Sequence, residues 1–333
     1  MKTNNLATHI SGFLQDYLTL QKGFSRHTIL SYRDTIKLFL NFIAAHDGKS
    51  ISRLTLTDLT PTLVVHFLDH LEKERRNSIQ TRNIRLACIH SFSRYLTYHE
   101  PLIFDHCQRI LTIPFKRTKA TPVEYLEREE MKAILQAVDR ASPDGYRDYT
   151  LLSFMYNTGA RVQEVIHLPA SALQLERPFQ VRFLGKGSKE RLCPLWSETA
   201  NLLRCLLNQR AINLRTDALV FVNHRGQGFT RYGVQYLLSK YAYAAARHCQ
   251  SLERKHIHPH TLRHTTAMHL LQSGVDINTI RAWLGHTRLE TTNRYAEINL
   301  EMKRKVLDNY LPISKNSRPW KRSDQLIQWL ESL

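Results

Sequence analysis

A tyrosine stands among polar and charged side chains in the segment LGHTRLETTNRYAEI, residues 284–298. The segment holds one histidine, two arginines, three threonines and a single tyrosine, Tyr295, with little apolar content. A tyrosine in such surroundings can be a half-buried core residue with its hydroxyl at the surface, or it can be a nucleophile. The segment alone leaves both interpretations open.

Two upstream segments carry arginine at helix starts. TGARVQE places Arg161 shortly after a glycine, with Glu164 one turn later on the same face, which is also typical of an ordinary ion pair or capping arrangement. HPHTLRH places His260 and Arg263 three positions apart at a helix N-terminus, where an anion is favoured. Both segments therefore predict side chains that could bind a negatively charged group.

Two other chemical interpretations are weaker. The five histidines between 256 and 269 could suggest zinc, but no cysteine or carboxylate lies nearby in ligand spacing and no H-E-x-x-H motif occurs. Lys186 lies in a Gly-Lys-Gly turn that resembles a phosphate loop, but the P-loop spacing is absent. We therefore expect no metal site and no nucleotide loop.

The charge of the whole chain points to a polyanionic partner. Over 333 residues, 47 Lys and Arg face 29 Asp and Glu, a net charge of +18 that is spread along the length. Nucleic acid is the leading partner for such a surplus. A merely soluble basic protein, a ribosomal-type protein or a membrane-surface binder would show the same composition.

The first 112 residues have the periodicity of helices alone. SRHTILSYRDTIKLFLNFIAAH begins with the candidate N-cap Ser25, and two further amphipathic helices follow. A basic, proline-flanked stretch at 113–124 then predicts a linker between two domains. Cationic residues on these elements are candidate DNA contacts: Arg26, Arg82, Arg85, Lys116, Arg117 and Lys119.

The second domain, expected at 125–312, mixes helices with one β pattern. Two short extended segments flank Gly185–Ser188 and predict a hairpin with Lys186 in its turn. A break at Thr158-Gly159 should separate an apolar helix from the one that Arg161 begins. The tail at 313–333 predicts a short amphipathic helix, which we expect to contact a neighbouring protomer.

The order of the four polar motifs, TGARVQEV, GKGSKER, HPHTLRHTTAMHLL and then LGH followed by Tyr295, resembles the tyrosine recombinase family of phage integrases and Xer-type recombinases. The resemblance covers nearly the whole chain. It implies a mainly α fold, with an N-terminal helical, SAM-like core-binding domain. The implied catalytic domain is mixed α/β, with a small antiparallel sheet and the DNA breaking-rejoining enzyme fold.

The resemblance also implies a role for each polar residue. Arg161 and Arg263 would hold the scissile phosphate, Tyr295 would attack it, and Glu164 would support the site. His260 is the candidate proton acceptor, His286 a phosphate ligand, and Lys186 the proton donor to the leaving oxygen.

The implied reaction is attack by tyrosine on a DNA phosphodiester, leaving a 3′-phosphotyrosyl bond. Two arginines can stabilise the charge of phosphoryl transfer, so we expect neither a metal ion nor another cofactor. The expected substrate is double-stranded DNA bearing recombination sites, with a dimer on each site and a tetramer on two. Related recombinases encoded nearby are further candidate partners.

The biological role stays open between movement of a mobile element and resolution of DNA molecules. A type IB topoisomerase-like nicking-closing enzyme shares the chemistry, and a catalytically silent DNA-binding accessory protein would share the fold. No stretch is apolar enough for a membrane span, and five scattered cysteines show neither metal-ligand spacing nor a disulfide framework. We therefore expect a cytoplasmic protein with no membrane partner.

Overall fold

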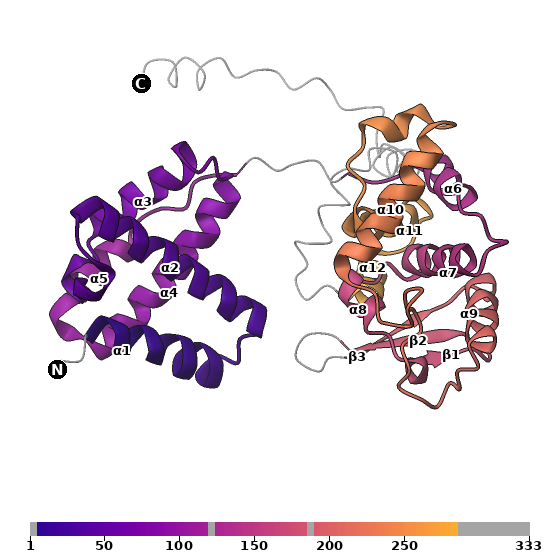
Figure 1. Cartoon of the computed structure of the whole chain (residues 1–333), viewed down its shortest axis with the longest axis horizontal. Coiled ribbons are helices and arrows are strands. Elements are labelled where there is room, and N and C mark those ends of the chain that lie inside the picture. The colour runs from indigo at the N-terminus through magenta and orange to yellow at the C-terminus, as the bar shows by residue number, and fades with distance from the viewer. Residues whose placement is uncertain (1–4, 119–123, 185–189, 286–333) are drawn as a thin grey trace, which may run out of the picture. The chain divides into compact units, whose positions relative to one another are not determined.

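The chain divides into two compact units, residues 1–121 and 122–333 (Figure 1). The computed structural model describes residues 5–118, 124–184 and 190–285. Among these residues, no helix is long and apolar enough to cross a membrane.

The first unit is built from helices, as its sequence predicts. Ser25, Thr60 and Ser78 each begin a helix, because the side-chain oxygen accepts a hydrogen bond from the backbone N–H three residues later. Gly48, at a φ of +64°, ends the first of these three helices. The elements are α1 (Asn5–Ser11), a π-helix (Gly12–Gln21), α2 (Arg26–Asp47), α3 (Pro61–Lys73), α4 (Ile79–His99) and α5 (Phe104–Leu111).

The start of the expected linker is fastened to this unit. Asn83 on α4 pairs with both backbone groups of Lys116, at 2.8 and 3.1 Å. Arg82 donates to the Pro114 carbonyl, and Glu72 on α3 accepts from the Lys116 ammonium at 2.7 Å. The stretch from 113 to 116 is therefore part of the first unit, and a linker over 113–124 stays a prediction.

The second unit packs seven α-helices and a three-stranded sheet in its described residues. The helices are α6 (Arg128–Gln136), α7 (Pro143–Thr158), α8 (Val162–Ile166), α9 (Ser197–Gln209), α10 (Arg231–Ala246), α11 (Pro259–Gln272) and α12 (Ile277–Leu284). The strands are β1 (Leu173–Gln174), β2 (Gln180–Leu184) and β3 (Glu190–Pro194).

The hairpin that the sequence predicts is present. β2 and β3 pair antiparallel, with Val181 opposite Cys193 and Leu184 opposite Glu190. β1 adds a short antiparallel strand beyond β2, which the sequence analysis missed. The inward positions Val181, Phe183 and Cys193 are buried in the core of the unit.

Helix α7 forms the centre of this unit and packs against both α9 and α11 (Figure 1). It ends at Gly159, whose φ of +58° favours glycine. A Cβ at this position would lie 2.5 Å from Leu284 Cδ2, so glycine also allows α12 to approach closely. α12 in turn packs on α11 and β3, which brings α8, α11, α12 and the hairpin together.

Both units thus bear out the expected fold class. The architecture is mainly α, with a helical N-terminal unit and a second unit that holds a small antiparallel sheet.

Candidate active site

The structure describes four of the seven predicted catalytic and supporting residues: Arg161, Glu164, His260 and Arg263. Their side chains converge where α8, α11 and the C-terminal end of α12 meet. The other three predictions, Lys186, His286 and Tyr295, lie outside the described residues.

Arg263 is a buried cation on the second turn of α11. Its side chain is 4% exposed, and it donates to the Gly159 carbonyl at 2.7 Å and the Leu284 carbonyl at 2.6 Å. A buried guanidinium is stable only where its donors meet acceptors. The bonds therefore fix the orientation of Arg263 between the end of α7 and the end of α12.

Arg161 lies directly before the first residue of α8 and is more accessible, at 39% side-chain exposure. It donates to the Gly285 carbonyl at 3.2 Å and to Glu164 at 3.1 Å. Because Leu284 and Gly285 are consecutive, Arg161 and Arg263 reach the same short piece of backbone. Two guanidinium groups thus lie close together at this point.

Glu164 links these cations to the hairpin. Besides the Arg161 bonds, it accepts two hydrogen bonds from Arg191 on β3, at 2.7 and 2.8 Å. Burial alone would raise the pKa of Glu164, but the bonds from Arg191 and Arg161 outweigh it and lower that pKa. The carboxylate is therefore ionised and shared between two arginines.

The last carbonyls of α12 are capped by side chains. The final carbonyl groups of a helix lack partners within it. Here Trp283, Leu284 and Gly285 each accept from a different arginine, namely Arg191, Arg263 and Arg161 in that order. The backbone that leads directly into residue 286 is consequently held by three charged donors.

His260 lies on the first turn of α11, among cations. Burial lowers its pKa, and the neighbouring positive charges of Arg263, Arg161 and Arg231 lower it further. The imidazole is therefore neutral at pH 7 and able to accept a proton. The sequence analysis did not single out Arg231, which begins α10.

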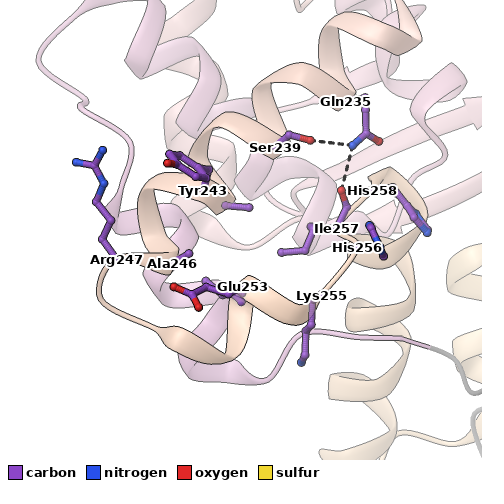
Figure 2. Close-up of a pocket in the computed structure, with 12 residues that line it drawn as sticks. Gln235, Ser239, Tyr243, Ala246, Arg247, Glu253, Lys255, His256, Ile257 and His258 are labelled. Atoms are coloured by element: carbon purple, nitrogen blue, oxygen red, sulfur yellow. Dashed lines mark hydrogen bonds between the residues drawn. The ribbon is translucent and has the colours of Figure 1, made fainter.

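The N-terminus of α11 is fixed by its cap. His258 Nδ1 accepts from the Thr261 backbone N–H at 3.1 Å. Figure 2 shows Gln235 of α10 bonding both Ser239 and the Ile257 carbonyl, each at 3.0 Å, beside a cleft of about 730 Å³. These contacts position His260 by holding the chain just before it.

Two of the five histidines that could suggest zinc make other hydrogen bonds in the structure. His258 caps the helix, and His269 bonds the Tyr156 hydroxyl at 2.8 Å. In the described part of the chain, no three His, Cys, Asp or Glu side chains gather as a metal site would require. A reaction without a metal ion stays a prediction.

The comparisons with known proteins agree with this arrangement. The phage integrase family model matches residues 124–302, and the phage integrase N-terminal SAM-like domain matches residues 10–100. The putative integrase/recombinase y4rC of Sinorhizobium fredii (strain NBRC 101917 / NGR234) is 39% identical over 333 residues, which are 100% of this chain and 99% of the relative. The chain belongs to the phage integrase family. This membership confirms the resemblance seen in the sequence.

The family relatives include enzymes of the tyrosine-recombinase type. Tyrosine recombinase XerC of Pelotomaculum thermopropionicum (strain DSM 13744 / JCM 10971 / SI) is 32% identical over 314 residues, or 92% of this chain and 99% of the relative. The chain is accordingly a tyrosine-type site-specific recombinase. Its fold also matches the solved structure of XerH recombinase bound to difH substrate, with a TM-score of 0.65 at 20% identity, over 84% of this chain and 78% of the other.

Arg82, one of the residues predicted to contact DNA, is buried in the structure. Arg82 is 6% exposed and ion-paired with Glu72 at 3.2 Å, because the α4 face that carries it packs against α3 and the chain after α5. Arg85 is half-buried and donates to Thr35 at 2.7 Å. The amphipathic pattern located the helix but not which of its arginines face inward.

The remaining candidates of the first unit differ in accessibility. Arg26, at the first position of α2, and Arg117 are exposed. Lys116 is about half exposed and paired with Glu72. Lys119 lies outside the described residues.

Sequence reasoning also missed Arg191. The sequence position of Arg191 could have indicated its direction, because it lies two positions from the buried Cys193 and therefore on the same face of β3. An arginine at an inward-facing strand position requires an acidic partner.

Proposed function

We propose that this recombinase cuts and rejoins double-stranded DNA through a 3′-phosphotyrosyl intermediate. The observation that carries the proposal is the pair of guanidinium groups, Arg161 and Arg263, on consecutive carbonyls beside a neutral His260. Two such planar donors can hold the non-bridging oxygens of a phosphodiester and stabilise the charge that builds up during attack.

Each step then has a candidate residue. Tyr295 attacks the phosphorus through its hydroxyl oxygen, and His260 accepts the proton that the hydroxyl loses. The bond to the 5′-oxygen breaks, and Lys186 supplies the proton that this oxygen needs to leave as a hydroxyl. His286 donates to a phosphate oxygen. The phosphotyrosyl bond retains the energy of the broken bond, so rejoining needs no ATP and no metal ion.

A second surface supports DNA as the substrate. On α10, Tyr232, Tyr236 and Tyr243 are 82%, 68% and 75% exposed, and Arg231 is exposed beside His260. Exposed aromatic and basic side chains together are typical of nucleic-acid contacts. We propose that this face of α10 contacts the DNA duplex next to the scissile phosphate.

DNA complexes of structurally similar recombinases support an assembly on the recombination site. XerH has been solved bound to its difH substrate, and a lambda integrase dimer bound to a COC' core site. For this chain we propose a dimer on each site and a tetramer on two, in the cytoplasm, with a helix in the tail at 313–333 bridging protomers. Moving a mobile element and resolving DNA molecules both fit this activity, and related recombinases encoded nearby could share the sites.

The domains proposed for this activity are a DNA-binding domain at 1–112, a linker at 113–124 and a catalytic domain at 125–312. The first four residues of that linker are the ones attached to the first unit.

A two-plasmid assay separates this function from its rivals. A site-specific recombinase joins two plasmids that each carry a site, whereas a type IB topoisomerase-like enzyme relaxes one supercoiled plasmid without joining two. A silent accessory protein binds DNA and does neither. Recombinant plasmid that disappears with Tyr295→Phe supports the proposal, and relaxation without recombinants overturns it.

A further inference from the structure

We propose that Arg191 is a positioning residue for cleavage, because it neutralises Glu164 and so leaves the charge of Arg161 available to the phosphate. This inference rests on the proposed function. Arg191 would not touch the DNA; it would act through the carboxylate that it shares with Arg161.

The hydrogen-bond geometry around Glu164 is unequal. Arg191 Nη1 donates to one carboxylate oxygen at 2.7 Å and Nη2 donates to the other at 2.8 Å, the two-pronged arrangement of strong arginine–carboxylate pairs. The Arg161 side chain makes one longer contact, at 3.1 Å. The stronger partner of Glu164 is therefore the arginine from the hairpin.

The surroundings make this pairing electrostatically important. Arg191 and Glu164 are each 10% exposed, so water screens their charges poorly. Without Arg191, Arg161 would be the remaining arginine paired with Glu164. The carboxylate would then neutralise the positive charge of Arg161 and oppose binding of a phosphate. With Arg191 present, the three groups carry one net positive charge, and the more exposed Arg161 presents it.

Further contacts hold Arg191 in place for this task. Its Nε donates to the Trp283 carbonyl at 3.1 Å, and its guanidinium lies 4.3 Å from the centre of the Phe183 ring. A Cβ on Gly285 would come within 2.9 Å of Arg191 Cδ. Arg191 thus couples the hairpin, Glu164 and the end of α12.

The competing explanation is that Arg191 only stabilises the fold. The two explanations differ in what removing Glu164's charge should do. If an uncompensated carboxylate causes the defect, then Glu164→Gln added to Arg191→Met should restore activity. If only packing matters, the second substitution should leave the defect unchanged or deepen it.

The test measures single-turnover cleavage of a nicked duplex by the full-length chain. Removal of a direct charge-stabilising donor typically costs 10²–10³-fold, so a residue acting one step away should cost about tenfold. We expect Arg191→Met to be about tenfold slower than wild type, and the double variant to recover to within about threefold. An Arg191→Met rate equal to wild type, or a double variant no faster than the single one, overturns the inference.

A second substrate gives an independent readout. A methylphosphonate at the scissile position removes one negative charge, so the uncompensated Glu164 should matter less. The Arg191→Met defect should shrink below about threefold on this substrate; an equal defect on both substrates indicates a purely structural role and overturns the inference.

The control is Arg210→Met, since Arg210 also donates to two backbone carbonyls, Leu219 and Val220, but lies at the end of α9 away from the site. If Arg191→Met does not fold, Arg191→Lys is measured in its place. The Arg191→Lys variant should cleave the phosphodiester at a rate within about threefold of wild type, and a tenfold loss of rate on both substrates overturns the inference. Absence of any adduct with the wild-type chain would instead refute the proposed function.

Discussion

Arg161 and Arg263 donate to carbonyl groups of consecutive residues, at 3.2 and 2.6 Å, although Arg161 precedes α8 and Arg263 lies on α11. The two guanidinium groups therefore occupy one small region of the site. Such adjacent like charges are costly unless an anion neutralises them. A DNA phosphate is the anion that the family and the charge of the chain indicate.

Arg263→Lys should abolish most cleavage while preserving DNA binding. A lysine ammonium cannot reproduce the planar fork that reaches both the Gly159 and Leu284 carbonyls. We expect single-turnover cleavage to fall at least about 10²-fold, with affinity for the site within about threefold. Arg210→Lys serves as the matched control, and an Arg263→Lys variant with near wild-type cleavage would contradict the assigned role.

Stability should fall as the pH drops below 6.5. Burial lowers the pKa of His90, His260 and His269 beneath that value in the folded chain. Just below pH 6.5 the unfolded chain then binds more protons than the folded one, so the free energy of unfolding decreases with decreasing pH. The carboxylates with lowered pKa values, such as Glu164, lose their contribution only below 4.5.

Urea denaturation between pH 7.5 and 5.5 checks this dependence. His269→Gln should reduce the slope of unfolding free energy against pH, because one buried neutral imidazole is removed. A wild-type stability that rises towards pH 5.5 would show that these rings are protonated in the folded chain.

Much of the fold could be predicted from the sequence because local signals agree with tertiary packing. Ser25, Gly159 and the two extended segments on either side of residues 185–189 predicted a helix start, a helix end and a strand pair where the structure has them. The short strand β1 was missed, since two residues carry no periodicity. The burial of Arg82 was not predictable, because it depends on Glu72 and Pro114, which are distant in sequence.

For the site, the order of the motifs predicted which residues matter but not how they contact one another. That Arg191 shares Glu164 with Arg161 depends on strand register and on the approach of α12, which spacing does not encode. The same holds for Arg231, which only the fold brings near His260.

Gly285→Ala should impair cleavage more than stability. Gly285 has a φ of +65°, where a side chain costs about 1–2 kcal/mol, and its Cβ would also press on Arg191. Gly48→Ala is the matched control, because Gly48 has a φ of +64° with no atom within 4 Å of the added Cβ. The two variants should lose a similar amount of stability, and only Gly285→Ala should also cleave about tenfold more slowly than the wild type. Equal cleavage rates in both variants would contradict the proposed importance of the α12 end.

Arg231→Gln should weaken binding of the site and reduce its salt dependence. Loss of one phosphate contact lowers the slope of log affinity against log salt by about 1. Arg215, which is exposed in the segment after α9 and outside α10, provides the control substitution Arg215→Gln. Fluorescence anisotropy at several salt concentrations measures both slopes, and an unchanged slope for Arg231→Gln would remove this residue from the DNA-binding face.

The most direct test of the central claim is covalent trapping on a nicked suicide substrate, with EDTA present. The wild-type chain should form a protein–DNA adduct that migrates slowly on a denaturing gel, with the protein on the 3′-phosphate. Tyr295→Phe should bind the same DNA and form no adduct. An adduct formed by Tyr295→Phe, or none formed by the wild-type chain, would contradict the claim that Tyr295 is the nucleophile of a tyrosine recombinase.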